Sequence, residues 1–160
     1  MSPKGSERLQ TLMINGETHR VEIKNNTILL DLLRERFGLL SVREGCGAGA
    51  CGTCTVLIDG QPISSCLKLA ATLPAGSEIT TVEGLANGDE MHPLQQAFWD
   101  NHALQCGFCT SGFLMSAVDL LQKNPHPSED EIRHGLSGNL CRCTGYANII
   151  KAVKAVADGS

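Results

Sequence analysis

The chain has 160 residues, which is enough for one ordinary domain or for two small ones. Its formal net charge of −4, without a dense cluster of Lys and Arg, argues against nucleic acid as a partner. Residues 1–10 are polar and charged, so we expect no secretory signal peptide and no transmembrane segment, and hence a cytoplasmic protein.

Residues 8–84 are expected to form a mixed α/β domain. An apolar-rich run at 9–14 and an alternating run at 21–23 flank Asn15-Gly16, which is a strong hairpin signal. Further strands are expected at 55–58, 62–66 and 79–82, with Asp59-Gly60 as a second hairpin turn.

One helix is expected within this domain, from Ile28 to Arg36. Asn26 or Thr27 is expected to cap its start, and Gly38 to end it. A small sheet with a single helix fits a β-grasp fold.

Beyond a linker at 85–91, the hydrophobic period becomes helical, and residues 92–157 are expected to form a second domain of four helices. Pro93 opens a helix that runs to about Leu104, and a second helix follows at 112–123. Ser128 and Glu131 form a capping-box pattern that opens a third helix, ending near Gly135, and residues 149–157 carry the fourth. The expected fold class is α+β.

The first four cysteines have the spacing C-x4-C-x2-C followed at a distance by C; they are Cys46, Cys51, Cys54 and Cys66. This is the plant-type spacing of [2Fe–2S] ligands. Four thiolates around two ferric ions and two sulfides leave a net charge of about −2, which backbone N–H groups must offset in a tightly wrapped loop. The neighbouring glycines supply the backbone freedom for this wrapping: Gly45, Gly47, Gly49 and Gly52. A zinc site usually pairs two C-x2-C knuckles, and a reducing compartment disfavours disulfides, so both are weaker alternatives.

The last four cysteines read C-x2-C, a gap of 31 residues, then C-x-C; they are Cys106, Cys109, Cys141 and Cys143. Each pair lies between two expected helices, so we expect the pairs to face each other across the helical domain. Taken alone, this group fits either an iron–sulfur or a zinc site. Beside the first group it favours a second [2Fe–2S] cluster with four Cys ligands, because no Rieske-like C-x-H pattern is present.

The remaining candidates for chemistry are weak. The five histidines are scattered, and none is favoured as a ligand: His19, His92, His102, His126 and His134. Four aromatic residues of the second half are expected to be mostly core, with one or two exposed as anchors for a partner: Phe98, Trp99, Phe108 and Phe113.

Three cysteine-containing segments resemble the signatures of a known family: Glu44-Gly-Cys-Gly-Ala-Gly-Ala-Cys-Gly-Thr-Cys54, Gln105-Cys-Gly-Phe-Cys-Thr110 and Gly138-Asn-Leu-Cys-Arg-Cys-Thr-Gly-Tyr146. They look like the motifs of the iron–sulfur (small) subunit of molybdenum hydroxylases, the superfamily of xanthine dehydrogenase, aldehyde oxidoreductase and carbon monoxide dehydrogenase. The resemblance runs from about Leu9 to Val156.

The resemblance implies an N-terminal β-grasp, plant-type ferredoxin-like domain and a C-terminal four-helix [2Fe–2S]-binding domain. Electrons from a molybdopterin site on a large subunit would pass one at a time through this chain to FAD on a medium subunit, or to another acceptor. The implied assembly is a dimer of heterotrimers. By motif position, Gln105 would hydrogen-bond the pterin and Cys143 would lie closest to it; alternatively, Gln105 only caps the preceding helix.

The substrate of such an assembly binds outside this chain, and overall resemblance favours an N-heterocyclic aromatic. Two functions of other classes stay open at this point. One is a stand-alone two-cluster ferredoxin that shuttles electrons between changing partners. The other is a zinc-dependent structural or interaction module.

Overall fold

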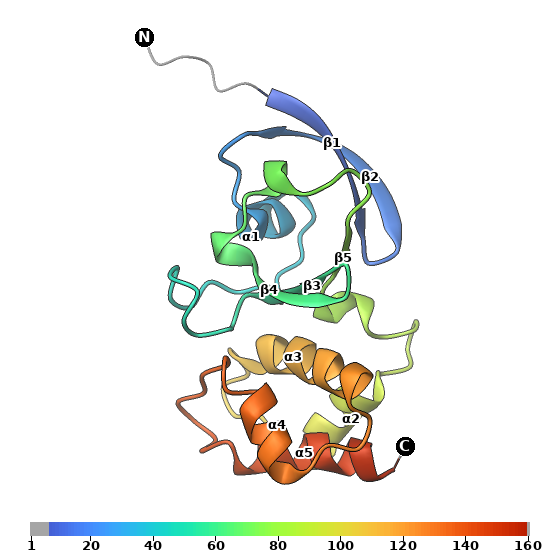
Figure 1. The fold of residues 1–160 in the computed structure, drawn as a ribbon, viewed down its shortest axis with the longest axis vertical. Coiled ribbons are helices and arrows are strands. Elements are labelled where there is room, and N and C mark those ends of the chain that lie inside the picture. The colour runs from blue at the N-terminus through green and yellow to red at the C-terminus, as the bar shows by residue number, and fades with distance from the viewer. Residues whose placement is uncertain (1–6, 160) are drawn as a thin grey trace.

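Residues 7–159 are described by a computed structural model, and they form two parts stacked along the long axis of the molecule (Figure 1). Within these residues, a five-stranded sheet with a short helical segment makes up the first part, and four helices make up the second. This arrangement confirms the α+β class. In the same range, no helix combines the length and the apolar character that crossing a bilayer requires.

The sheet has the strand order β2-β1-β5-β3-β4. Its strands are β1 (Glu7–Ile14), β2 (Glu17–Lys24), β3 (Thr55–Ile58), β4 (Gln61–Ser64) and β5 (Glu78–Thr80). Strands β1 and β5 pair in parallel, and the other neighbours pair antiparallel. Both predicted hairpin turns are confirmed: Asn15-Gly16 and Asp59-Gly60 lie at positive φ, which these residue types adopt most readily.

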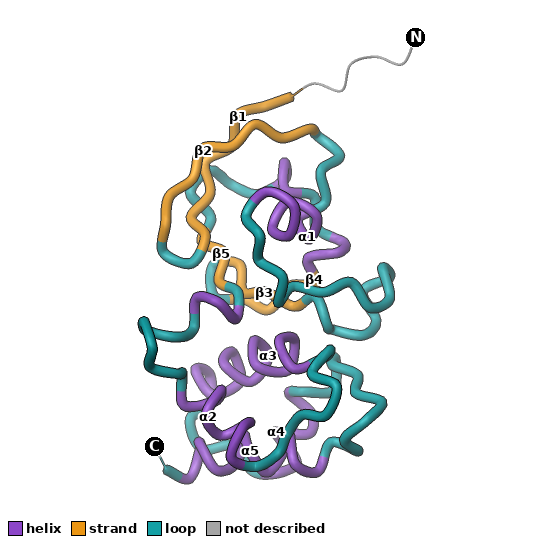
Figure 2. Tube along the Cα trace, turned by 180° about the vertical axis from the view of Figure 1, so that it is seen from behind, coloured by secondary structure: helices purple, strands orange, loops and turns teal. Residues whose placement is uncertain are grey.

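The helical segment of the first part consists of α1 (Leu29–Asp31), which continues directly into the π-helical turn η1 (Leu32–Arg36). This segment lies beside the sheet (Figure 2), and its leucines are buried with the sheet residues in one core: Leu29, Leu30, Leu32 and Leu33. The predicted caps were wrong, because Ile28 is the N-cap residue and makes no side-chain capping bond. The hydroxyl of Thr27 instead accepts a hydrogen bond from Lys24 N–H at 3.1 Å, which closes the turn after β2.

Three short 3₁₀ helices complete the first part: η2 (Ser65–Leu67), η3 (Ala70–Thr72) and η4 (Val82–Gly84). They account for two strand ends that were predicted too late. Strand β4 ends at Ser64 because η2 begins at the next residue, and β5 ends at Thr80 because Thr81 leads into η4.

The second part contains α2 (Pro93–Asp100), α3 (Thr110–Lys123), α4 (Glu129–Gly135) and α5 (Ala147–Asp158). The capping box at the start of α4 is confirmed: the Ser128 hydroxyl accepts from Glu131 N–H, and the Glu131 carboxylate accepts from Ser128 N–H. The predicted length of α2 was wrong by four residues. His102 has φ +50°, and N–H groups of His102 and Ala103 donate to the carbonyls of Trp99 and Phe98, which is the Schellman pattern of a helix end.

Strand β3 lies between the two parts and is covered on both faces, so all four of its residues are buried. Val56 and Ile58 belong to the core of the sheet domain, whereas Leu57 belongs to the core of the helices. Helix α3 lies directly against this strand, as the ribbon and the tube both show (Figures 1 and 2). The two parts therefore pack on each other through β3. One cysteine loop belongs to each part, and both loops lie at the same edge of the molecule, on either side of the junction (Figure 1).

Candidate metal centres

The first cysteine group lies on the loop that precedes β3 and on η2. Cys46 is exposed and Cys51 partly exposed, whereas Cys54 and Cys66 are buried. Their side chains are hydrogen-bonded in two pairs, Cys46 with Cys51 and Cys54 with Cys66. The structure therefore brings together all four cysteines of the first predicted group.

Hydrogen-bond donors of the loop converge on the outer sulfurs. The N–H groups of Ala48 and Ala50 donate to Cys46 Sγ at 3.4 and 3.3 Å, and Thr53 Oγ1 donates to Cys51 Sγ at 3.2 Å. These backbone donors, that of Ala48 above all, lower the pKa of Cys46 to about 7. Burial raises the pKa of Cys66 to about 11. The inner thiol therefore needs a bound cation to ionise, which is how metal ions act on cysteine ligands.

The glycines of this loop are required by its geometry. Gly47, Gly49 and Gly52 have φ values of +61°, +72° and +68°, which other residues adopt at a cost. A Cβ atom on Gly45 would lie 2.9 Å from Cys51 Sγ. The loop is thus wrapped around the sulfurs as a cluster-binding loop must be.

The second cysteine group lies where four helix ends meet. Cys106 and Cys109 connect α2 to α3, and Cys141 and Cys143 connect α4 to α5, as predicted. The Sγ atoms of Cys106 and Cys143 are 3.6 Å apart, and the side chains of Cys109 and Cys141 are hydrogen-bonded to each other. The outer pair is exposed and the inner pair partly buried.

The charge environment of the second group resembles that of the first. Burial raises the pKa of Cys109 to about 12. Burial also opposes ionisation of Cys141, but the side chain and N–H of Thr144 donate to its Sγ at 3.2 and 3.4 Å and lower its pKa overall. The N–H of Phe108 donates to Cys106 and lowers its pKa. Donors thus converge on these sulfurs as well.

The pairing of the sulfurs fits a binuclear cluster. In an all-cysteine [2Fe–2S] cluster the two irons share four thiolates, so each iron takes two. Within each group, two pairs of cysteine side chains are hydrogen-bonded: Cys46 with Cys51, Cys54 with Cys66, Cys106 with Cys143, and Cys109 with Cys141. A structural zinc site places four ligands around one ion. The donor set, the converging N–H groups and the paired sulfurs therefore fit iron–sulfur chemistry.

Direct hydrogen bonds join the two cysteine loops. Leu140 N–H donates to the carbonyl of Cys51 at 2.9 Å, and the buried Asn139 donates from Nδ2 to the carbonyl of Gly52 at 3.0 Å. Gly112 of α3 lies so close to the Gly52 carbonyl that a Cβ atom would overlap it. Sequence reasoning placed Asn139 in a cysteine segment but missed its contact, and it missed Gly112, because no local pattern links residues that are more than fifty positions apart.

Gln105 lies beside the second group, but it does not cap a helix. Helix α2 ends at Asp100 with Asn101 as its C-cap residue, so the capping alternative is wrong. Gln105 Nε2 donates to the carbonyl of Cys143 at 3.2 Å. The side chain is thereby fixed next to a predicted ligand.

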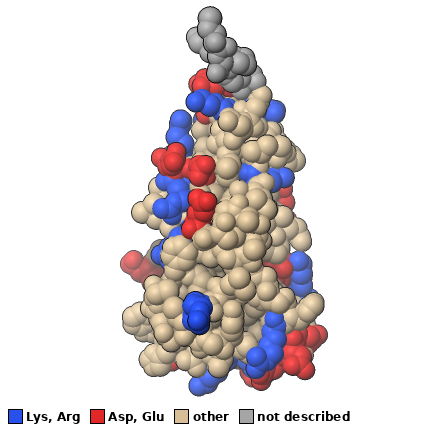
Figure 3. Space-filling model, turned by 90° about the vertical axis from the view of Figure 1, so that its left-hand side faces the viewer, with Lys and Arg blue, Asp and Glu red and all other residues tan. Residues whose placement is uncertain are grey.

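The other sequence candidates have ordinary structural surroundings or lie on the surface. His92 caps α2, since its Nδ1 accepts from Leu94 N–H at 3.2 Å. Phe98 and Phe113 are buried, while Trp99 and Phe108 are 68% and 46% exposed. The side of the molecule that carries the cysteine loops is largely uncharged (Figure 3).

Comparison with known proteins identifies both halves. The model of the "2Fe-2S iron-sulfur cluster binding domain" matches residues 12–82, and that of the "[2Fe-2S] binding domain" matches residues 81–154. The small subunit of nicotine 6-hydroxylase from Paenarthrobacter nicotinovorans is 48% identical over 95% of this chain and 92% of its own length. The iron–sulfur-binding subunit PaoA of aldehyde oxidoreductase from Escherichia coli K12 is 43% identical over 92% of this chain and 70% of its own.

A solved structure shows the same fold at similar identity. A chain of quinoline 2-oxidoreductase from Pseudomonas putida 86 superposes with a TM-score of 0.91, at 48% identity, over 96% of this chain and 95% of that one. Sequence and structure thus agree over nearly the full length of the chain. The chain therefore belongs to the iron–sulfur small subunits of the molybdenum hydroxylases.

Proposed function

We propose that this chain transfers electrons within a molybdenum hydroxylase through two [2Fe–2S] clusters held by its eight cysteines. The first cluster would be bound by Cys46, Cys51, Cys54 and Cys66, and the second by Cys106, Cys109, Cys141 and Cys143. The observation that carries the proposal is the arrangement of sulfurs in two sets of two pairs, on loops that are hydrogen-bonded to each other. When bound, each cluster takes up and releases one electron at a time.

The exposure of the sulfurs supports a role between two partners. Cys46 of the first set and Cys106 and Cys143 of the second are exposed, so each set has an edge toward the surface. Where the sets approach each other, the carbonyl of Cys51 accepts from the N–H of Leu140, the residue before Cys141. Electrons would thus enter at one edge, cross between hydrogen-bonded loops, and leave at the other edge.

We assign the molybdopterin side to Cys143 and Gln105, as the family resemblance implies. The contact between Gln105 Nε2 and the Cys143 carbonyl holds the amide beside the exposed sulfur of Cys143. Within residues 7–159 this is the one hydrogen bond of the Gln105 side chain, so its Oε1 atom is left to accept a bond from the pterin.

The partners would be a large molybdopterin-binding subunit and a medium FAD-binding subunit, in a dimer of heterotrimers. The largely uncharged face in Figure 3 suits burial at such interfaces, because charged side chains are depleted in the centre of a protein interface. Large apolar side chains are exposed around the cysteine loops: Leu40, Leu67, Phe108 and Leu140. The proposed division into domains is 8–84 and 92–157, with 85–91 as the linker.

We further propose a cytoplasmic location and an N-heterocyclic aromatic substrate. Eight cysteines that serve as iron ligands need a compartment in which thiols stay reduced. Nicotine and quinoline, which occur in the names of two relatives at 48% identity, contain nitrogen heterocycles, whereas the aldehyde oxidoreductase relative is 43% identical. Turnover of the purified complex with nicotinate, compared with an aromatic aldehyde, tests the substrate class.

Metal analysis combined with co-purification tests the electron-transfer role. The chain isolated under anaerobic conditions should contain four iron and four acid-labile sulfide, two for each cluster, and should give two distinct EPR signals after reduction. Tagged chain should also retain a large molybdenum-containing subunit. Two irons per chain would leave one cysteine set without a cluster, and zinc with a colourless spectrum would refute the proposal. Iron-loaded chain that never copurifies with a molybdenum protein would favour the free ferredoxin.

A further inference from the structure

We infer that Arg43, a residue of the first domain, raises the reduction potential of the cluster in the second domain. The inference rests on the proposed function, because it assumes a cluster on the second cysteine set. It concerns a tuning residue whose side-chain hydrogen bonds go to backbone carbonyls of the second cysteine loop. No sequence motif pointed to it.

Arg43 crosses from the first cysteine loop to the second. It precedes Cys46 by three residues, yet its Nη1 donates to the carbonyls of Gly107 and Phe108 at 2.6 and 3.2 Å. The guanidinium carbon lies 5.7 Å from the centre of the Phe108 ring, within reach of a cation–π contact. Since Arg43 is only partly exposed, solvent screens its charge less than that of a surface arginine.

A single peptide group connects Arg43 to a cluster sulfur. The peptide between Gly107 and Phe108 accepts from Arg43 through its C=O and donates to the Cys106 sulfur through its N–H. A charge-assisted bond at the carbonyl polarises the peptide, and hydrogen bonds in such a chain strengthen one another. Gly107 makes this turn possible with φ +75°, and a Cβ there would meet no other atom within 4 Å.

The direction of the effect follows from charge. Reduction adds one negative charge to a cluster, and the hydrogen bonds to its sulfurs and the net charge around it set its potential. The positive charge of Arg43 and the strengthened Phe108 N–H bond both favour the reduced form. Within residues 7–159, the hydrogen bonds of the Arg43 side chain go to the second cysteine loop alone, so the second cluster should respond more than the first.

Arg34 provides a matched control. Its Nη1 also donates to two backbone carbonyls, those of Leu40 and Val42, at 3.1 and 2.7 Å. These bonds hold the segment from which Arg43 extends, but they do not reach either cysteine loop. Loss of Arg34 therefore removes the same charge and the same type of bond without touching the Gly107–Phe108 peptide.

The experiment is an EPR-monitored redox titration of the assembled complex with wild-type chain, Arg43→Leu, Arg43→Lys and Arg34→Leu. In Arg43→Leu, the potential of the second cluster should fall relative to that of the first. The equilibrium constant for passing one electron from the first cluster to the second should fall about tenfold, which corresponds to about 59 mV for a one-electron couple. Arg43→Lys keeps the charge but loses the two-carbonyl geometry, so its shift should be smaller. Arg34→Leu should shift the potential of the second cluster less than Arg43→Leu does, because the Gly107–Phe108 peptide keeps its bond from Arg43.

Three results would overturn the inference. They are an unchanged second potential in Arg43→Leu, an equal shift of both clusters, or the same shift in Arg34→Leu. If Arg43→Leu loads iron poorly, the test is made with Arg43→Lys and Arg43→Gln instead. A second-cluster potential equal to that of the wild type in both variants would show that Arg43 does not tune it. Absence of two cluster signals from the wild-type complex would refute the proposed function instead, so the two failures are distinguishable.

Discussion

A close approach between the two domains makes Gly112 a sensitive position. A Cβ atom there would overlap the carbonyl oxygen of Gly52 and lie 3.0 Å from Asn139 Nδ2. The carbonyl is held in place, because it accepts hydrogen bonds from Thr55 N–H at 3.1 Å, from Thr55 Oγ1 at 2.7 Å and from Asn139 Nδ2 at 3.0 Å. In Gly112→Ala, helix α3 must therefore move away from the first cysteine loop.

The expected loss of stability in Gly112→Ala combines opposing effects. Inserting a methyl group into a well-packed contact typically costs about 1–3 kcal/mol. Alanine is favoured over glycine in a helix interior by up to about 1 kcal/mol, but Gly112 is the third residue of α3, where the gain is smaller. We expect a net destabilisation of about 1–2 kcal/mol, which lowers Tm by roughly 2–8 °C in a chain of this size.

The assay is thermal unfolding of iron-loaded chain, followed by circular dichroism and by bleaching of the cluster absorbance. Gly135→Ala is the control, because a Cβ at Gly135 would meet the methyl end of the Leu120 side chain at 2.9 Å. A leucine end can rotate away, whereas the hydrogen-bonded carbonyl of Gly52 cannot, so Gly135→Ala should lose far less stability. If Gly112→Ala unfolds at the wild-type temperature, or no earlier than Gly135→Ala, the close approach does not constrain the packing of the domains.

Four further variants test the cysteine sets, Gln105 and Glu83. Cys51→Ser should remove or alter one EPR signal and Cys109→Ser the other, because serine is a poor iron ligand; loss of both signals from either folded variant would contradict the grouping. Gln105→Leu should leave both clusters assembled yet slow their reduction by substrate in stopped-flow, and losing one such hydrogen bond corresponds to about 1–3 kcal/mol. An unchanged rate and an unchanged yield of complex would remove Gln105 from the pterin site. Burial opposes ionisation of Glu83, but bonds from Ser41 and Thr81 outweigh it and lower the pKa of Glu83, so its ionised form stabilises the fold above the ordinary glutamate pKa. Glu83→Gln should therefore reduce stability at pH 7, and the difference should fade as the pH falls through the lowered pKa; a constant difference between pH 7 and pH 3 in chemical denaturation would refute this.

Elements fixed by local chemistry could be predicted from the sequence. Asn15-Gly16 and Asp59-Gly60 placed two hairpins, and Ser128 with Glu131 placed the start of α4, because each signal involves neighbouring residues. The end of α2 could not be predicted. Its left-handed residue is His102, where glycine is the usual signal. His102 is held in this conformation by the two backbone bonds that close the helix, from His102 N–H and Ala103 N–H, and no residue pattern predicts them.

The candidate site also has a part that the sequence predicts and a part that it does not. The spacing of the cysteines predicted two groups of four, since ligands on one loop are close by construction. The contacts between the groups depend on tertiary packing: Arg43 bonds to Gly107 across 64 positions and Asn139 to Gly52 across 87. Asn139 lies within the third cysteine segment and Arg43 directly before the first, but nothing in these segments indicates a contact with a residue so far along the chain.

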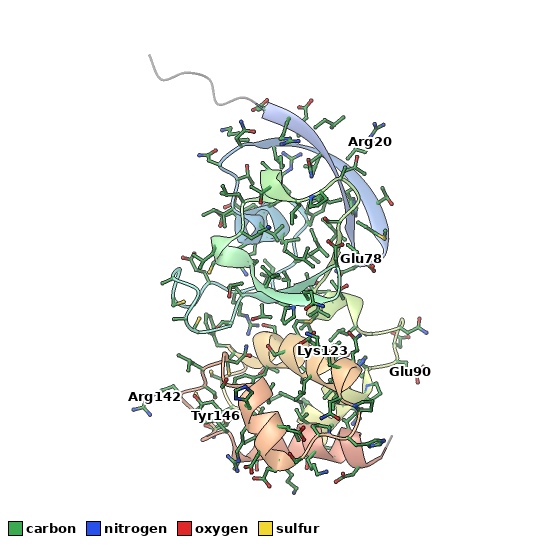
Figure 4. All side chains as sticks on the ribbon, viewed as in Figure 1. Arg20, Glu78, Glu90, Lys123, Arg142 and Tyr146 are labelled. Atoms are coloured by element: carbon green, nitrogen blue, oxygen red, sulfur yellow. The ribbon has the colours of Figure 1, made fainter. Side chains whose placement is uncertain are left out.

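The bonds that cross the domain boundary are concentrated at the cysteine loops. Asn139 and Leu140 donate to the first loop, Arg43 donates to the second, and Ser111 Oγ donates to the Ser41 carbonyl at 2.7 Å just before the first loop begins. Away from the loops the bonds are longer. Lys123, which Figure 4 shows on α3, donates to Gln61 Oε1 at 3.3 Å in an exposed bond, and Gln95 Nε2 donates to the carbonyl of Val82 at 3.4 Å.

This distribution has a consequence for function. A hinge motion that separated the two cysteine sets would have to break the bonds that also shape the loops around them. The geometry between the sets is therefore maintained by the same groups that set the environment of each sulfur. Under the proposed function, electron transfer between the clusters therefore needs no docking step within the chain. Cys46, Cys106 and Cys143 are exposed, so the steps that depend on docking would be those between these edges and the proposed partners.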